Sequence, residues 1–390
     1  MTRNNLASHL LGLSLLSAFI PYKIYPVIYV LSSLIILSMG ITKKNLTVFI
    51  FALMYCLYGV FVYITGGFGN EESDLAITKL IFNCGFFLAI SISGVFSEKN
   101  ANDNSSSLLV IERYLSFVVI ASLIQVLFLQ IISGGIRFSS DNSYTAGLMF
   151  TDHAILWGVQ DKNIMGAKIA LFGFLHAYTY YRLKGKINYI FGMLYILCSA
   201  LTLSRTSLLL SLLTFFLLIY LNTRYIYRYY IILPLIFFSA ILLFPKIAEL
   251  VRLDSITNVS RDDGMGIRIL FWTAFFSRFT DISFWGEGLL SASAFLGQYS
   301  VTGSANNMHN LYINNYLDLG VPGSVFYLLF LMAIIFKVYK RNRNRTHTLL
   351  MIAPILVVTN TLYTGYDNDT WMYYSILLVI SNFTILKKHP

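Results

Sequence analysis

Charged residues are scarce in this sequence. Only 12% of its 390 residues are Asp, Glu, Lys or Arg, whereas a soluble domain carries about 25%. Hydrophobic residues make up 57%, and the mean hydropathy is +0.68. So few charges cannot cover a water-exposed surface of this size, so most of the outer surface is expected to face lipid. The composition excludes a water-soluble globular protein and predicts an all-α integral membrane protein.

Cysteine pairs and metal-binding patterns are also missing. The three cysteines, Cys56, Cys84 and Cys198, lie in apolar stretches and have neither pairing nor metal-ligand spacing. We interpret them as small core residues. The acidic pair Asp262-Asp263 is interpreted as solvated. With no zinc motif, Walker motif, coiled coil or internal repeat, the sequence predicts a protein that uses no metal and no other cofactor.

The net charge of +10 does not indicate a nucleic-acid partner. In a soluble protein such a charge would suggest one. Here the basic residues lie in short segments between apolar runs, where the preference of Lys and Arg for cytoplasmic loops explains them better. No nucleic acid is therefore expected to bind.

Apolar runs recur along the whole chain. A membrane-crossing helix needs about 20 apolar residues. We predict about twelve transmembrane helices: Ala7–Ile20, Tyr25–Ile41, Leu46–Ile64, Leu75–Phe96, Tyr114–Ile132, Ile164–Tyr181, Ile187–Leu203, Thr206–Leu221, Tyr229–Phe244, Val321–Phe336, Leu349–Leu362 and Trp371–Leu386. The seventh and eighth are predicted to form a hairpin that turns near Arg205, because one helix of that length would exceed the ~30 Å hydrocarbon core.

Charge assigns an orientation to these helices. With the N-terminus in the cytoplasm, most of the 28 basic residues fall in inside segments, as the positive-inside rule requires. Both termini are then predicted to be cytoplasmic. The first apolar run shows no cleavage site and is expected to be retained as a transmembrane helix. The polar inside segment Asn102–Ser107 is interpreted as a hydrophilic linker.

Two outside segments are longer than ordinary loops. They are Ser133–Asn163 and Pro245–Gly320, the latter between the ninth and tenth predicted helices. The larger segment is predicted to contain an amphipathic helix, Met265–Phe279. Since long loops on a rigid scaffold often carry function, we expect residues 245–320 to hold part of the active site of a single membrane domain, 1–390.

Four basic or titratable side chains stand out on the outward side. His309 precedes an apolar run, and histidine is the side chain best able to exchange a proton near neutral pH. Arg205 lies at the hairpin turn, where a charge is usually paired or functional. Arg268 lies on the predicted amphipathic helix, and Lys79 lies near the outward end of the fourth apolar run. Each also has a plainer interpretation, as an interfacial histidine, snorkelling cations or a solvated helix face.

Together these residues indicate an anionic substrate at the membrane surface. Arginine offers a planar, permanently charged fork suited to phosphate oxygens. A lipid-linked diphosphate has a charged head for the arginines and an apolar tail for the helices. Arginines would stabilise the diphosphate as a leaving group without a metal. Nearby positive charge would also lower the pKa of the histidine and keep it neutral, as a general base must be.

The sequence resembles the superfamily of O-antigen polymerases (Wzy-type) and O-antigen ligases. The motif that carries the resemblance is His309-Asn310 followed after nine residues by Gly320 and then by an apolar run. Further matches are Leu203-Ser204-Arg205-Thr206-Ser207-Leu208, Gly266-Ile267-Arg268 with Trp272, Gly286-Glu287-Gly288, Thr78-Lys79-Leu80-Ile81 and Asp161-Lys162-Asn163. The order of these elements fits the family over most of the chain.

The resemblance implies a GT-C-like, metal-independent glycosyltransferase of the bacterial inner membrane. Its donor would be an undecaprenyl-diphosphate-linked oligosaccharide, and its partners would include a chain-length regulator and a flippase. His309 would be the catalytic base, and Arg205 and Arg268 would bind the diphosphate. Substrate binding is further assigned to Lys79, Asn310 and Arg137.

The resemblance leaves the exact reaction open. A polymerase joins the growing glycan to the next lipid-linked repeat unit, whereas a ligase transfers the polymer to lipid A–core. We favour the polymerase, because the abundance of Ile, Asn, Tyr, Phe and Lys suits an AT-rich surface-polysaccharide gene. A lipid-linked-glycan flippase or transporter remains an alternative, although transporters usually show repeated halves and charges near the bilayer midplane. A non-catalytic scaffold gives no reason for His309 and the two arginines.

Overall fold

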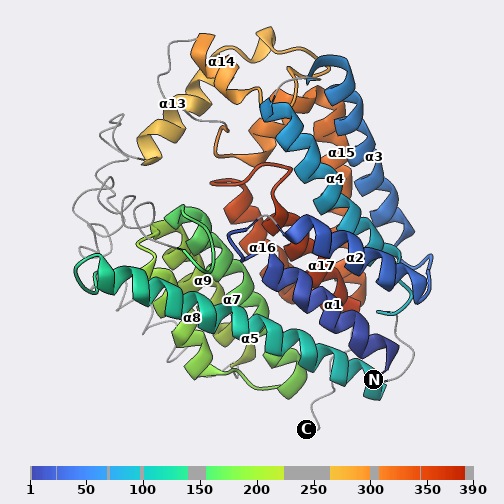
Figure 1. The fold of residues 1–390 in the computed structure, drawn as a ribbon, viewed down its shortest axis with the longest axis vertical. Helices are drawn as coiled ribbons and strands as arrows, with labels where there is room; N and C mark the ends of the chain where they lie inside the picture. The colour runs from blue at the N-terminus through green and yellow to red at the C-terminus, as the bar shows by residue number, and fades with distance from the viewer. Residues whose placement is uncertain are drawn as a thin grey trace.

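The computed structural model of this chain is built from helices (Figure 1). Within its described residues it has no strand and a single isolated β-bridge, between Ile41 and Ser93. The described residues are 2–22, 24–67, 71–96, 101–138, 155–223, 264–298, 307–342 and 344–382.

Most of these helices are apolar. In chain order they are α1 (Arg3–Ser17), α2 (Tyr25–Ser38), α3 (Leu46–Val62), α4 (Glu71–Ile92), α5 (Ala101–Ile132), α7 (Lys162–Lys184), α8 (Tyr189–Leu201), α9 (Arg205–Asn222), α13 (Gly264–Ser277), α14 (Ala292–Gln298), α15 (Leu311–Asn342), α16 (Arg345–Thr359) and α17 (Asn368–Asn382). A π-helical turn, Tyr63–Gly67, extends α3, and a 3₁₀ turn, Phe279–Asp281, follows α13. Five helical stretches of the described part are long and apolar enough to cross a bilayer: Leu46–Gly66, Glu71–Ile92, Ser105–Ile132, Arg205–Asn222 and Leu311–Asn342. The described part is thus all-helical and that of an integral membrane protein, and the number twelve stays a prediction.

The predicted apolar runs largely coincide with helices. Every one except the ninth, Tyr229–Phe244, overlaps a helix, and that run lies outside the described residues. The hairpin prediction is confirmed, because α8 ends at Leu201 and α9 begins at Arg205. The predicted helix at Met265–Phe279 is present as α13, which ends at Ser277; its amphipathic character stays a prediction.

One sequence-based boundary was wrong, and one helical segment was not predicted. The tenth predicted helix begins at Val321, directly after the non-helical Gly320, but α15 also contains a helical segment before this kink, Leu311–Leu319. The supposed linker Asn102–Ser107 is the first part of α5. Hydropathy misses such polar helical extensions because other helices provide their partners: the Ser106 hydroxyl donates to the side-chain oxygen of Asn5 on α1, at 2.8 Å.

Polar contacts between loops define one end of the helix bundle. The amide of Gly158 donates to Phe19, the hydroxyl of Ser73 donates to the carbonyl of Leu289, and the Asn310 amide donates to Asn360. We call this the site end, because it carries His309. In Figure 1, α13 and α14 lie at the top of the molecule at this end.

A second set of contacts joins the loops of the opposite end. Gly94 donates to Gly40, the Lys337 ammonium donates to the carbonyl of Lys44, and Arg182 donates to the Asn342 side chain. The loops thus separate into two sets, as the charge alternation predicted. That the site end faces away from the cytoplasm remains a prediction.

Helix α17 forms the centre of the bundle. Every residue from Asp369 to Asn382 is buried, and α17 packs against α4, α7, α15 and α16. The ring of Trp371 stacks on Phe330 of α15, with centroids 5.1 Å apart, and lies 5.5 Å from the Phe87 ring of α4. Burying apolar surface contributes about 25 cal/mol per Å², so this aromatic layer fixes the helices that surround α17.

A buried ion pair crosses the site-end half of this core. The ammonium of Lys168 on α7 lies 3.0 Å from a carboxylate oxygen of Asp369, and both side chains are 2% exposed. The ammonium also donates to the carbonyl of Ala18 at 2.7 Å, and the other Asp369 oxygen accepts from the Tyr363 hydroxyl at 3.0 Å. Two charges buried this deeply persist only when both are paired.

Removal of one charge should therefore destabilise the protein. Replacing a single partner of a buried pair costs about 3–5 kcal/mol, whereas replacing both by apolar residues of similar size is often nearly neutral. We expect Lys168→Met to lower the midpoint of thermal unfolding of the detergent-solubilised protein, and Lys168→Met combined with Asp369→Leu to recover most of the loss.

Lys184→Met is the matched control, because Lys184 is the exposed last residue of the same helix. Surface substitutions usually change stability by no more than about 0.5 kcal/mol. A double variant that unfolds at the same temperature as Lys168→Met would contradict this account of the pair.

Candidate active site

His309 lies immediately before α15 in an uncommon backbone conformation. Its φ is 51°, in the left-handed region, which for a residue other than glycine costs on the order of 1–3 kcal/mol. The His309 amide donates to the Asn307 side chain at 2.8 Å, which holds the turn. Since such strain persists only where the surroundings impose it, the backbone of His309 is held in one conformation at the site end of the protein.

Asn310 is the cap of α15. Its side-chain oxygen accepts from the amides of Tyr312 and Ile313 at 3.0 and 3.1 Å, so it satisfies donors that a helix start leaves unpaired. The Asn314 side chain reaches back to accept from the Met308 amide at 2.9 Å. The residues on both sides of His309 are therefore bonded to the first turns of α15.

Helix α13 packs onto this turn. The Trp272 indole donates to the carbonyl of Met308 at 3.0 Å, and the ring of Phe271 lies parallel to the His309 ring, with centroids 6.3 Å apart. Met308 itself is buried among Phe271, Phe275 and other apolar residues. Arg268 lies one helical turn before Trp272 and so on the same face of α13. The structure thus brings Arg268 to the side of α13 that faces His309.

The surroundings keep the His309 ring neutral. Burial and, to a smaller extent, the positive charge of Arg268 lower the pKa of His309 from its ordinary value of 6.5 to about 4, although the Asp161 carboxylate acts in the opposite direction. Its Nδ1 is buried and makes no hydrogen bond to the described residues. An imidazole that is uncharged at neutral pH can accept a proton, so His309 has the protonation state of a general base.

The nine residues between Asn310 and Gly320 form a short rigid helical segment. At about 1.5 Å per residue, Leu311–Leu319 is roughly 13 Å long. It ends where Gly320 adopts φ 61° and ψ −159°. A Cβ at Gly320 would collide with the carbonyl oxygen of Phe284, and one at Gly286 would collide with the carbonyl oxygen of Asp318.

Three backbone hydrogen bonds join the segment containing Gly286 and Gly288 to this kink. Glu287 donates to Leu317 at 2.8 Å, Gly288 donates to Asp318 at 3.2 Å, and Val321 donates to the carbonyl of Phe284 at 2.9 Å. The histidine motif and the glycine motif of the sequence are therefore two halves of one junction. The Asp318 carboxylate completes it by accepting from the Ser291 hydroxyl at 2.9 Å and from the Tyr366 hydroxyl at 2.8 Å.

Arg205 begins α9 at the same end of the molecule. The hairpin turn before it contains Leu203 at φ 59° and packs closely on Gly166 of α7, where an added Cβ would meet Thr202, Ser204 and Ser207. Asp161 caps α7 by accepting from Asn163 and Ile164 at 2.7 and 3.0 Å. Because Asp161 also acts electrostatically on His309, the start of α7 lies near both the hairpin and the histidine.

Arg137 lies on an exposed segment after α5. Its backbone amide donates to the side-chain oxygen of Gln130 at 3.0 Å, and the Gln130 amide donates to the carbonyl of Leu201 at 2.7 Å. Arg137 is therefore attached to the end of α8, four residues before Arg205. The structure groups Arg137 with the hairpin rather than with His309.

The other two predicted substrate-binding residues have structural partners. The Lys79 ammonium lies 3.9 Å from a carboxylate oxygen of Asp367, and both side chains are partly exposed. The Asn310 side chain caps α15 and donates to Asn360. Substrate binding by Lys79 and Asn310 stays a prediction. The contacts described above give each of these side chains a structural role that needs no substrate. The acidic pair Asp262-Asp263 lies outside the described residues.

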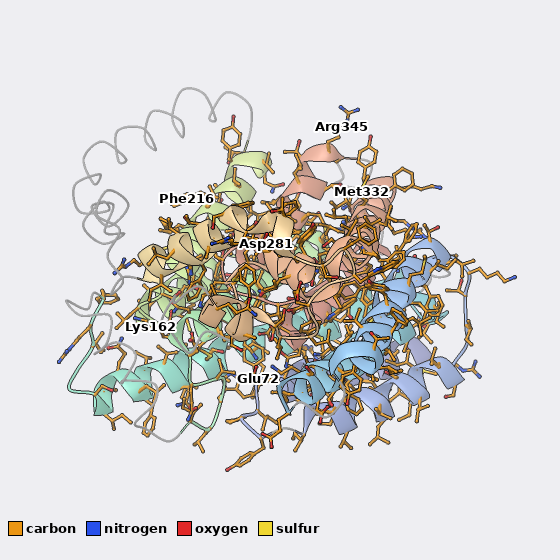
Figure 2. The ribbon with its side chains drawn as sticks, turned by 90° about the horizontal axis from the view of Figure 1, so that it is seen from above. Glu72, Lys162, Phe216, Asp281, Met332 and Arg345 are labelled. Carbon is orange, nitrogen blue, oxygen red and sulfur yellow. The ribbon has the colours of Figure 1, made fainter. Side chains whose placement is uncertain are left out.

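Helix starts add positive potential to this end. Helices α7, α9 and α15 all begin here, at Lys162, Arg205 and Leu311. The N-terminus of a helix carries about half a positive charge and exposed amides that favour anions. Figure 2 views the molecule from the side on which α13 lies, with Lys162 at the start of α7 and Asp281 just beyond α13. An anion at this end would meet helix starts together with arginines.

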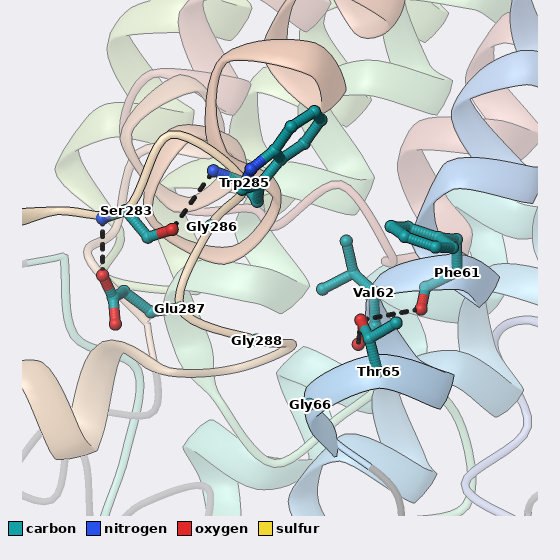
Figure 3. A pocket seen from close by; sticks show the side chains of 9 residues that line it. All are labelled: Phe61, Val62, Thr65, Gly66, Ser283, Trp285, Gly286, Glu287 and Gly288. Atoms are coloured by element: carbon teal, nitrogen blue, oxygen red, sulfur yellow. Dashed lines mark hydrogen bonds between the residues drawn. The ribbon is translucent and has the colours of Figure 1, made fainter.

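A hollow of about 360 Å³ lies elsewhere on the site end, between the π-helical turn after α3 and the segment 283–288. Figure 3 shows Phe61 and Thr65 on one side of it and Trp285 and Gly286 on the other, with the Glu287 carboxylate bonded to the Ser283 amide. None of the predicted site residues lines it. We therefore place the candidate active site at His309 and Arg268 and not in this hollow.

Sequence reasoning missed three buried charged residues near the site. Asp318 lies inside the histidine motif itself, and Lys168 and Asp369 form the buried pair described above. A signal was present, because a charge within an apolar run is rare and usually paired. Only the structure identifies the partners, since Lys168 and Asp369 belong to helices far apart in the sequence.

Comparison with known proteins supports the resemblance. Residues 190–328 match the family described as O-Antigen ligase. The matched segment contains Arg205, Arg268, His309 and Gly320, whereas Lys79 and Arg137 lie outside it. No curated protein matches the chain. The resemblance to the superfamily of O-antigen polymerases and ligases is thus confirmed.

A side chain at Gly320 should disrupt the junction. We expect Gly320→Ala to destabilise the protein strongly, because its Cβ would meet the Phe284 carbonyl and its φ of 61° is strained for alanine. The midpoint of thermal unfolding and the proteolysis of residues 283–320 measure the effect.

Gly85→Ala on α4 is the control, because nothing lies within 4 Å of an added Cβ there, and alanine favours a helix by about 1 kcal/mol over glycine. The junction described here would be refuted if the two variants showed the same stability and the same cleavage pattern.

Proposed function

We propose that this chain, whose residues 190–328 match the O-antigen ligase family, polymerises undecaprenyl-diphosphate-linked oligosaccharide repeat units. The reaction would take place at the periplasmic face of a bacterial inner membrane and would build O-antigen or a related surface polysaccharide. The observation that carries the proposal is a neutral, fixed His309 beside the cationic Arg268, at the site end of a membrane protein built from helices.

The proposed step is a glycosyl transfer in which the leaving group is stabilised without a metal. His309 accepts the proton from the acceptor hydroxyl as that oxygen attacks the anomeric carbon of the donor. The bond between this carbon and the diphosphate oxygen breaks, and the diphosphate leaves with the electron pair. Arg268, Arg205 and the starts of α7 and α9 stabilise the departing negative charge. The lipid tail remains against the apolar helices.

A ligase reaction is the second candidate, favoured by the description of the matched family. The chemistry at His309 would be the same, and only the acceptor would differ: lipid A–core in place of a lipid-linked glycan. The family match gives no support to the flippase alternative. The lipopolysaccharide of a strain that lacks this gene separates the two reactions. Core with a single repeat unit indicates a polymerase, and bare core with polymer left on the carrier lipid indicates a ligase.

Loss of the imidazole should slow transfer severely. We expect His309→Ala to reduce the rate by a factor on the order of 10²–10⁴, the usual contribution of a general base, with expression and membrane insertion unchanged. Arg268→Lys should reduce it by a factor on the order of 10², because lysine keeps the charge but loses the planar fork. The assay is elongation of a lipid-linked oligosaccharide by the purified protein.

Two variants serve as controls. His347→Ala removes an imidazole that stacks on Tyr181 at the opposite end, and Arg278→Lys changes an exposed arginine that pairs with Asp281 beyond α13. Both should elongate the donor at the rate of the unchanged protein. Near-normal elongation by His309→Ala would exclude its role as the base.

The pH dependence of transfer should report the lowered pKa of His309. The base must be neutral, and burial together with Arg268 brings the pKa of the substrate-free protein to about 4. At low donor concentration, where the rate reflects the free enzyme, it should stay level as the pH falls through the ordinary imidazole range. It should decline only as the pH approaches about 4.

Arg268→Gln removes the positive charge and should move this decline to higher pH. The assignment of the base to a buried imidazole beside Arg268 fails if the unchanged protein already loses half its rate near the ordinary histidine pKa of 6.5.

A further inference from the structure

The loop between α16 and α17 contacts both ends of the short helical segment that follows His309. At the first end, the Asn310 amide donates to the side-chain oxygen of Asn360 at 3.3 Å. At the other, the Tyr366 hydroxyl donates to the Asp318 carboxylate at 2.8 Å. These contacts lie eight residues, or roughly 12 Å, apart along α15. We call residues 360–369 the clamp segment.

The clamp segment is in turn fixed to other helices. The Asn83 amide of α4 donates to the carbonyl of Tyr366 at 2.7 Å, and the Trp371 indole donates to the carbonyl of Gly365 at 2.9 Å. At its end, Asp369 forms the buried pair with Lys168 and accepts from the Tyr363 hydroxyl. Through Lys168 the clamp segment is joined to α7, and the start of α7 lies near both the Arg205 hairpin and His309.

Net stabilisation alone does not explain the buried ion pair between Lys168 and Asp369. Buried ion pairs contribute little net stability compared with apolar residues of similar volume, and some are retained because they specify one arrangement of the groups around them. Lys168 meets Asp369, the Ala18 carbonyl and the Phe19 ring, 4.9 Å away, at one point. It thereby fixes α1, α7 and the clamp segment relative to one another.

We propose that Lys168 is a positioning residue for the glycosyl transfer: through Asp369 and the clamp segment it sets the place of His309 relative to α7. Lys168 is 2% exposed and would act only through the residues that it contacts. The proposal rests on the proposed function, in which His309 and the arginines of two different helices act on one diphosphate-linked donor. Displacement of a catalytic group by 1 Å can cost about 10²-fold in rate. A shift of His309 relative to α7 is therefore expected to lower kcat.

The double variant Lys168→Met with Asp369→Leu separates positioning from stability, because it removes the polar link while retaining buried side chains. We expect it to unfold near the temperature of the unchanged protein, yet to show a kcat lower by about 10-fold or more, with little change in KM for the lipid-linked donor. Recovery of kcat together with stability would overturn the proposal.

A second variant tests the same chain of contacts if the double variant fails to fold. Tyr366→Phe removes the hydroxyl that binds Asp318 and leaves the Ser291 contacts of that carboxylate in place. It should lower kcat in the same way. Tyr373→Phe is the matched control, since it removes a buried hydroxyl that donates to Met351 on α16. Equal kcat for these two phenylalanine variants would also overturn the proposal.

The reactivity of His309 gives a readout that does not depend on transfer. Diethyl pyrocarbonate modifies neutral imidazole, and mass spectrometry of the peptide that contains His309 measures its rate. We expect this rate to change in the double variant and in Tyr366→Phe, and to stay unchanged in Tyr373→Phe. If the unchanged protein shows no transfer, the proposed function fails while this measurement still tests the clamp. Unchanged reactivity in both clamp variants would refute the positioning role.

Discussion

The short helical segment between Asn310 and Gly320 is the constraint on which the site depends. Asn310 fixes its start by capping, and the close approach of Gly320 and Gly286 fixes its end, where neither position has room for a Cβ. Because the segment is rigid, anything that holds its two ends also fixes His309. The α13 helix, the glycine-containing segment 283–288 and the loop before α17 all contact it.

Charged residues have two roles around this segment. Asp318, Asp367 and Asp369 each bind to neighbouring side chains, and so they join helices to one another. Arg268 lies beside a histidine whose pKa it helps to lower. The guanidinium of Arg268 and the positive helix starts of α7 and α9 favour an anion at this end of the protein. A diphosphate on a lipid meets this electrostatic demand and the apolar surroundings together.

Much of the architecture could be predicted from the sequence, because lipid imposes long apolar runs and the basic residues mark one side. The runs, the hairpin at Arg205 and helix α13 were predicted in this way. The start of α15 was not, since Leu311–Leu319 contains polar residues that bind to other elements. Likewise, hydropathy cannot show that Tyr366 reaches Asp318 or that Lys168 reaches Asp369, because these contacts depend on how distant helices pack.

The motifs indicated candidate residues but not how they are arranged. The spacing of nine residues before Gly320 is explained only by the structure, in which the kink at Gly320 packs closely on the backbone of Gly286. The structure groups His309 with Arg268, and it places Arg137 nearer the hairpin of Arg205. Asn310, predicted to bind substrate, has a capping role that its position directly after His309 did not reveal.

The most direct test of the account is incubation of the purified protein in liposomes with one substrate only, an undecaprenyl-diphosphate-linked repeat unit, in the presence of a chelator. The account predicts longer lipid-linked glycans and the release of one undecaprenyl diphosphate for each unit added. Donor that remains unchanged, both alone and after addition of lipid A–core as an acceptor, would contradict a glycosyl transfer at His309.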